Sequence, residues 1–184
     1  IGKTGDGWLD GAVTYMTARS ALNQATESAF SEYGDLRKEG GDRALLAAAG
    51  NGLRAYLKGW PNGEYAVSAR GLLRRVYWLG HDRQKLLNEY IAQFAEKDAG
   101  KRNISLADMV QEIDIKLFGE LGPDDTRDPE LLAVIALREM RYYDEEGRLD
   151  SEKGPISRAS IETMRGLFAG KEELFAYLLA AHAY

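Results

Sequence analysis

The chain has 184 residues, 45% of them hydrophobic, which is typical of one globular domain and excludes a disordered chain. A formal net charge of −5 argues against a nucleic-acid-binding or anionic-membrane-binding surface, because such surfaces need a basic field. The chain has no cysteine, so disulfides, thiolate zinc sites and cysteine nucleophiles are excluded.

The aliphatic residues favour helix over strand, since 24 Ala and 23 Leu stand against 13 Val and Ile together. No apolar run approaches the roughly 20 residues of a membrane-spanning helix, so we expect no direct membrane span. The chain starts without Met or a signal-peptide pattern, and it ends in an apolar helical segment, residues 174–184, which we expect to be covered on several sides. We interpret it as an excised or processed piece of a longer protein.

Two helices are predicted in the first third of the chain, over residues 8–33 and 42–58, with Gly34 ending the first. The apolar residues that recur in the first helix are Trp8, Leu9, Ala12, Tyr15, Met16, Leu22, Ala25, Ala29 and Phe30. Gly50 and Gly52 are costly inside the second helix, and close approach of another helix explains them. A dinucleotide-binding loop is disfavoured because no strand precedes them.

A turn follows at Trp60-Pro61, where the proline favours an extended conformation of Trp60. Asn62 or Gly63 is expected to cap a third helix that runs to residue 79. A fourth helix is predicted over residues 83–97, so the third and fourth helices form a helical hairpin of about the length of one tetratricopeptide unit.

Residues 60–72 read Trp-Pro-Asn-Gly-Glu-Tyr-Ala-x-x-Ala-x-x-Leu. This resembles the Tyr-Pro-x-Ser-x-Tyr-Ala-x-x-Ala pattern of tetratricopeptide-like lipoproteins and periplasmic proteins of the bacterial envelope, among them the helical lipoprotein of the outer-membrane barrel-assembly machinery. The resemblance covers residues 44–95. It implies an all-α fold of stacked helical hairpins, a tetratricopeptide-like right-handed α-solenoid, in a periplasmic or outer-membrane-associated protein.

The second half of the chain also reads as helical. A polar linker over residues 98–102 precedes predicted helices at 105–118, 129–143 and 157–168, the second of which begins with a capping Asp and a proline. Residues 8–16 align on residues 65–73 at an offset of 57 residues, unlike the usual repeat of about 34. We expect one helical-repeat domain over residues 1–184, with possible sub-lobes at 8–97 and 103–184.

No catalytic, cofactor-binding or metal-binding motif is predicted. The two histidines, His81 and His182, do not form a ligand-spaced cluster. Asp108 and Glu112 share a helix face but lack the Glu-x-x-His partners of carboxylate-bridged metal sites. Residues 144–150 resemble a calcium loop in composition only.

The third and fourth helices are locally basic, which indicates either a solvated face or a patch for an acidic partner protein. The candidate protein-binding residues are Trp60, Arg70, Arg74, Tyr77 and Trp78. The sequence thus favours a scaffold or adaptor that binds another protein. The alternatives are a non-catalytic accessory domain of a larger envelope enzyme, such as a peptidoglycan-processing protein, and a self-contained helical enzyme.

Overall fold

A computed structural model describes residues 5–117, 121–141 and 155–184 of the chain. Within them the secondary structure is eight α-helices and two 3-10 helices, with one isolated bridge between Phe30 and Leu36. The chain divides into two compact units, which we call unit 1 (Ile1–Ser105) and unit 2 (Leu106–Tyr184). The all-helical character predicted from composition is therefore confirmed for the described residues.

Unit 1 contains α1 (Gly7–Ala29), α2 (Arg43–Gly59), α3 (Ala66–Leu79) and α4 (Arg83–Ala95). Asp6, Asp42 and Asp82 cap three of these helices, because their carboxylates accept hydrogen bonds from the exposed amide N–H groups of the first turn. Helix α1 ends at Ala29 rather than at residue 33. Phe30 is extended and pairs with Leu36, and the turn contains Gly34 at a φ of 88°.

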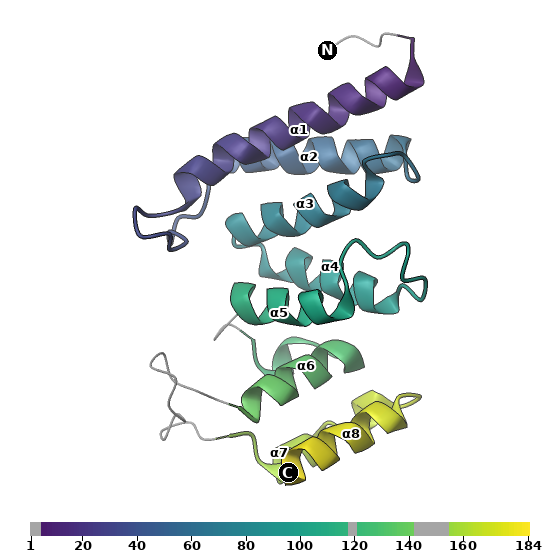
Figure 1. Cartoon of the computed structure of the whole chain (residues 1–184). Coiled ribbons are helices and arrows are strands. Elements are labelled where there is room, and N and C mark those ends of the chain that lie inside the picture. Colours follow the sequence, from purple (N-terminus) through teal and green to yellow (C-terminus); the bar gives the residue numbers. More distant parts are fainter. Residues whose placement is uncertain (1–4, 118–120, 142–154) are drawn as a thin grey trace. The chain divides into compact units, whose positions relative to one another are not determined.

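Successive helices of unit 1 pack on one another: α1 on α2, α2 on α3, and α3 on α4, with α3 also contacting α1 (Figure 1). Gly52 allows the close approach of α1 and α2, since a Cβ there would lie 2.7 Å from the Cβ of Ala18. The interpretation of Gly52 as a helix-contact glycine is confirmed.

The buried face of α1 differs from the predicted one. It consists of Gly11, Tyr15, Ala18, Leu22, Ala25 and Ala29. Leu9 and Met16, which we expected in the core, are 40% and 45% exposed. The predicted stripe is therefore confirmed at Tyr15, Leu22, Ala25 and Ala29 and is wrong at Leu9 and Met16.

Unit 2 contains α5 (Leu106–Lys116), α6 (Pro129–Glu139), α7 (Arg158–Thr163) and α8 (Glu172–Ala183), with 3-10 helices η1 (Pro123–Asp125) and η2 (Arg165–Phe168). Asp128 caps α6 and Ser157 caps α7, as the sequence predicted. The single helix predicted over residues 157–168 is wrong in its second half, where the chain tightens into η2. Helix α8 packs on α6, α7 and η2.

The core of unit 2 is an apolar cluster contributed by α6, α7, η2 and α8. Its buried members are Leu132, Ala133, Ala136, Ile161, Met164, Phe168, Phe175 and Leu178. Two hydrogen bonds from Arg138 to the carbonyls of Leu117 and Leu121 tie α6 to the end of α5. Tyr177 of α8 is 58% exposed, so the expected cover on several sides of this helix is not provided by the described residues.

Candidate functional site

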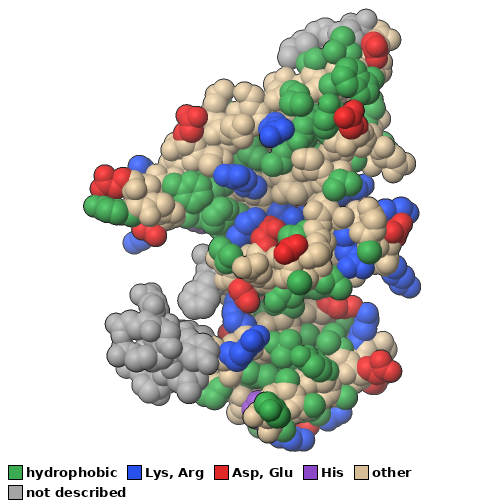
Figure 2. Space-filling view, viewed as in Figure 1, with side chains coloured by type: hydrophobic (Ala, Val, Ile, Leu, Met, Phe, Trp, Pro, Cys, Tyr) green, Lys and Arg blue, Asp and Glu red, His purple; other side chains and the backbone are tan. Residues whose placement is uncertain are grey.

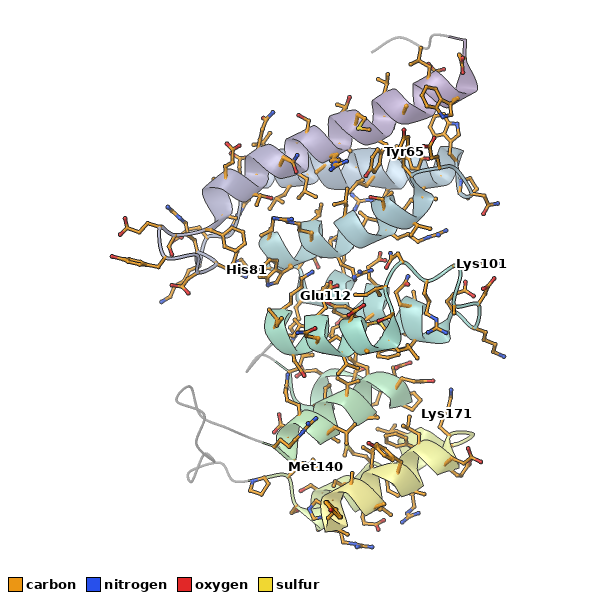
Figure 3. All side chains as sticks on the ribbon, in the orientation of Figure 1. Tyr65, His81, Lys101, Glu112, Met140 and Lys171 are labelled. Carbon is orange, nitrogen blue, oxygen red and sulfur yellow. The ribbon has the colours of Figure 1, made fainter. Side chains whose placement is uncertain are left out.

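The Trp60-to-Tyr65 turn is held by a cluster of aromatic side chains. The Tyr65 ring lies stacked on Tyr15, with centroids 4.6 Å apart and an interplanar angle of 3°. Tyr56 accepts a hydrogen bond from the Tyr65 amide N–H at 3.0 Å. This hydrogen bond fixes the residue that precedes α3. The predicted cap at Asn62 or Gly63 is wrong, because α3 begins after Tyr65 with no side-chain cap. Figure 3 labels Tyr65 at the start of α3.

Trp60 has a structural position in this cluster. Its ring stacks on Tyr56 with centroids 5.6 Å apart and lies over Gly11, where an added Cβ would be 3.1 Å from the ring. Gly63 is equally constrained, since a Cβ there would lie 2.5 Å from the Tyr56 hydroxyl. The turn motif thus encodes the contact between α1, α2 and α3, and Trp60 is a packing residue of that contact.

The two arginines predicted to form a basic patch on α3 do not share an exposed surface. Arg74 is only 4% exposed, and it donates a hydrogen bond to the Asn103 side chain at 2.5 Å. Arg70 is half-buried and reaches the Pro61 carbonyl at 3.4 Å. Arg74 lies against the Asn103 side chain and 5.9 Å from the centre of the Tyr90 ring, long-range contacts that the sequence spacing does not reveal. The expectation of a joint exposed patch is corrected accordingly.

The remaining candidates, Tyr77 and Trp78, are neighbours on α3 and point about 100° apart around the helix. Trp78 is half-buried against Phe30, with ring centroids 5.7 Å apart. Tyr77 is 7% exposed and lines a pocket of about 310 Å³. Of the five predicted residues, Tyr77 is the one that borders this pocket.

We call this pocket the α2–α3 groove. One wall is a face of α2 formed by Arg43, Leu46, Ala47, Gly50, Asn51 and Arg54. The other is formed by Val76, Tyr77, Gly80, Asp82 and Lys85, from α3, the following turn and α4. Arg43, Ala47, Asn51 and Arg54 are solvent-exposed, so the groove is open along α2.

The charges of the groove are unevenly paired. Lys85 forms an ion pair with Asp82, and the hydrogen bond from Lys85 holds the pKa of the Asp82 carboxyl below its ordinary value. Arg54 instead donates hydrogen bonds to two neutral groups, the Tyr77 hydroxyl at 3.1 Å and the Asn51 side-chain oxygen at 2.8 Å. With Arg43, the groove carries three cationic side chains against one carboxylate, in a chain that is acidic as a whole.

A second carboxylate lies near this cationic region. Burial raises the pKa of Glu89 on α4, while the charges of Arg74, Arg70 and Arg54 act in the opposite direction. Figure 2 shows that basic side chains over α1–α4 are interspersed with acidic and apolar ones on the face in view, and do not form one continuous basic surface. A ligand in the groove would therefore meet the charges of the groove itself, and not one basic surface that covers the whole unit.

The described residues contain no group of three or more His, Asp or Glu side chains able to hold a metal ion. His81 contacts the Arg37 carbonyl and His182 the Ile156 carbonyl, and Glu112 pairs with Lys116. The segment 144–150 lies outside the described residues.

Most residues that line the groove were not predicted from their spacing in the sequence. Arg43, Ala47 and Arg54 fall on one face of α2 at helical spacing, and that signal was available. Their position opposite Tyr77 and Lys85 depends on how α2 packs on α3. The groove can hold a ligand through guanidinium groups, a phenol and a short apolar floor.

Among the described residues, no helix combines the length and apolar composition needed to cross a bilayer. Comparison with protein families, curated proteins and solved structures yields no match to this chain.

Proposed function

We propose that this chain is a protein-interaction scaffold or adaptor, without catalysis of its own, that docks a segment of a partner protein in the α2–α3 groove. The observation that carries the proposal is the groove itself. Its floor is apolar, at Leu46, Ala47 and Val76, and cationic groups flank that floor. A small-molecule site usually encloses most of its ligand, whereas this groove is open along an exposed helix face. An open groove suits a chain segment that lies across it.

We further propose that the helices form a tetratricopeptide-like right-handed solenoid. In support, the hairpins α1–α2 and α3–α4 follow one another, each helix packs on the next, and α1 also contacts α3. Nearest-neighbour packing of this kind is the rule in helical repeats. The long α1 and the loop after it account for the offset between the first two units of the repeat.

The resemblance of residues 44–95 to tetratricopeptide-like envelope proteins supports a periplasmic or outer-membrane-associated location. Fractionation of a bacterium that expresses this chain, followed with an antibody against it, tests the location. Recovery of the protein with periplasmic or outer-membrane markers is expected, and recovery with cytosolic markers would overturn it.

Docking in the groove is tested by selecting peptides from a random displayed library with the purified chain. Two neighbouring exposed alanines of α2 provide matched variants, because Ala47 lines the groove and Ala48 does not. Ala47→Trp fills the floor and is expected to abolish binding of the selected peptides, whereas Ala48→Trp is expected to leave it unchanged. If no peptide is selected, or if both variants bind equally well, the groove is not a docking site.

A further inference from the structure

The two groove arginines of α2 are spaced to meet a ligand at two points. Arg43 and Arg54 are eleven positions apart, close to three full helical turns, so they project from the same face. At a rise of about 1.5 Å per residue, their Cα atoms are separated by about 16 Å along the helix axis. This is longer than one ligand side chain can bridge, and it suits a stretch of extended chain.

The surface between the two arginines is shallow and apolar. Ala47 and Gly50 face it from α2, and Val76 faces it from α3. An added Cβ at Gly50 would lie 3.2 Å from the nearest guanidinium nitrogen of Arg54 and 3.4 Å from the Val76 side chain. Glycine at this position therefore leaves room for the Arg54 guanidinium to lie beside the floor. The two cationic ends are thus separated by an apolar floor.

Arg54 and Tyr77 lie together in the groove, joined by a hydrogen bond. The Tyr77 oxygen accepts a hydrogen bond from Arg54, and among the described residues no acceptor receives the Tyr77 hydroxyl proton. A carboxylate placed there would accept from the Tyr77 hydroxyl and from the guanidinium. Such charge-assisted hydrogen bonds are about twice as strong as neutral ones. Asn51 holds the guanidinium from the other side, so the group is oriented before a ligand arrives.

We propose that the occupant of the groove is an internal extended segment of a partner protein, with acidic residues at positions i and i+4 and an apolar residue at i+2. This inference rests on the proposed function. In an extended chain these three side chains point the same way, and i and i+4 are about 13 Å apart. The flexible arginine side chains cover the remaining distance. One acid binds at Arg54 and Tyr77, the other at Arg43, and the apolar residue packs on Ala47 and Val76.

The test uses a synthetic peptide of sequence Ser-Glu-Ala-Leu-Ala-Glu-Ser, acetylated and amidated so that it carries no terminal charge. Its binding is measured by nuclear magnetic resonance titration of the isotope-labelled chain at low salt. Two control peptides carry Gln in place of both Glu, or place the second Glu at i+3, on the opposite face of the strand. Both controls are expected to bind at least tenfold more weakly, and binding of the first peptide is expected to fall as salt rises.

Variants of the chain locate the contact. Arg54→Gln is expected to weaken binding of the peptide at least tenfold, and Tyr77→Phe, which keeps the buried ring, severalfold. Arg75→Gln is the matched control, because Arg75 is an exposed arginine of α3 that does not line the groove. It is expected to change binding less than twofold. Circular dichroism of each variant confirms that the helices are retained.

Four outcomes would overturn the inference. Equal binding of the Glu and Gln peptides would remove the acidic requirement, and an unchanged affinity of both Arg54→Gln and Tyr77→Phe would move the contact elsewhere. Stronger binding of the same peptide with a free C-terminal carboxylate would assign the site to chain ends instead of internal segments. If peptides from the random library bind in a way that depends on Ala47 but not on acidic residues, the docking function stands and only this inference fails.

Discussion

The contacts between helices differ in kind between the two units, although unit 2 also has the two hydrogen bonds from Arg138. In unit 1 the contacts between helices include hydroxyl groups with defined partners: Tyr56 with the Tyr65 amide, and Tyr15 with the Ser68 hydroxyl at 2.7 Å. In unit 2 the core is a cluster of aliphatic and phenyl side chains, in which Phe168 and Phe175 pack with centroids 5.3 Å apart.

This difference bears on what each unit can do. Hydrophobic burial is non-directional and stabilises any arrangement that excludes water, whereas hydrogen bonds fix one geometry. The walls of the α2–α3 groove belong to helices whose relative position is set by the tyrosines. A binding groove needs such fixed walls, because ordering them on binding would cost affinity. The helices of unit 2 that pack around its apolar cluster, by contrast, are stabilised by hydrophobic burial.

The largest effect is expected from a cavity in unit 2. Phe168 is fully buried, so Phe168→Ala should lower the free energy of unfolding by about 3–5 kcal/mol. All three tryptophans of the chain, Trp8, Trp60 and Trp78, lie in unit 1. Denaturation followed by circular dichroism should therefore gain an early phase that tryptophan fluorescence does not follow.

The control for this cavity is Tyr177→Ala, which removes an exposed aromatic ring from α8 and should change the unfolding free energy by less than about 0.5 kcal/mol. If Phe168→Ala lowers the midpoint of the fluorescence transition to that of the circular dichroism transition, the two units unfold together. The contrast between them would then not extend to stability.

A smaller effect is expected at the Trp60-to-Tyr65 turn. Tyr56→Phe leaves the Tyr65 amide without its acceptor and should cost about 1–2 kcal/mol. Gly63→Ala places a Cβ 2.5 Å from the Tyr56 hydroxyl and 2.9 Å from the Cβ of Trp60, and should cost about 1–3 kcal/mol.

The double variant sharpens this expectation, because removing the hydroxyl relieves part of the clash with the new methyl group. The double variant should therefore lose less stability than the sum of the two single losses, by at least about 0.5 kcal/mol. Urea denaturation followed by tryptophan fluorescence measures this difference. Strict additivity would mean that Gly63 and the Tyr56 hydroxyl do not constrain each other.

The helices themselves follow from local sequence. Capping residues such as Asp128 and Ser157 act within a few positions of their own helix, so their role can be predicted from the sequence alone. The start of α3 is the exception. The residue before it, Tyr65, is held by the Tyr56 hydroxyl, nine positions earlier on another helix, and the nearer polar residues predicted as caps do not cap the helix.

The candidate site was harder to predict, because charge is visible in a sequence and burial is not. Arg74 looked like part of a basic face until Asn103, 29 positions away, was found to lie against it. Arg54 carries the same charge and was overlooked, since its partner Tyr77 comes from a different helix. Tertiary packing decides which arginine is available to a ligand.

A stabilising effect is expected from unit 2 when a buried charge is removed. One carboxylate oxygen of Asp114 on α5 is buried with no hydrogen-bond partner among the described residues, and burial raises the pKa of this carboxyl against the opposing charges of Arg138 and Arg141. A raised pKa means that the folded state binds more protons than the unfolded state. The unfolding free energy therefore falls as pH rises through and above the ordinary Asp range.

Asp114→Asn removes this ionisation and should stabilise the chain at neutral pH by up to about 1 kcal/mol, with little difference at a pH below the ordinary Asp range. Urea denaturation at the two pH values, followed by circular dichroism, measures the effect. A variant less stable than the parent at neutral pH would show that the attraction of Arg138 and Arg141 outweighs the cost of burial.

The smallest effect is expected on the outer face of α1, where the comparison between the units predicts that large apolar residues contribute little. Met16 is exposed, so Met16→Gln should change the unfolding free energy by less than about 0.5 kcal/mol. Gly52→Ala tests the opposite face, because its Cβ would lie 2.7 Å from that of Ala18 and should force α1 and α2 apart, at a cost of about 1–3 kcal/mol. If the methionine variant loses more stability than the glycine variant, α1 is held from its outer side, and the directional contacts of unit 1 are not what fixes the groove.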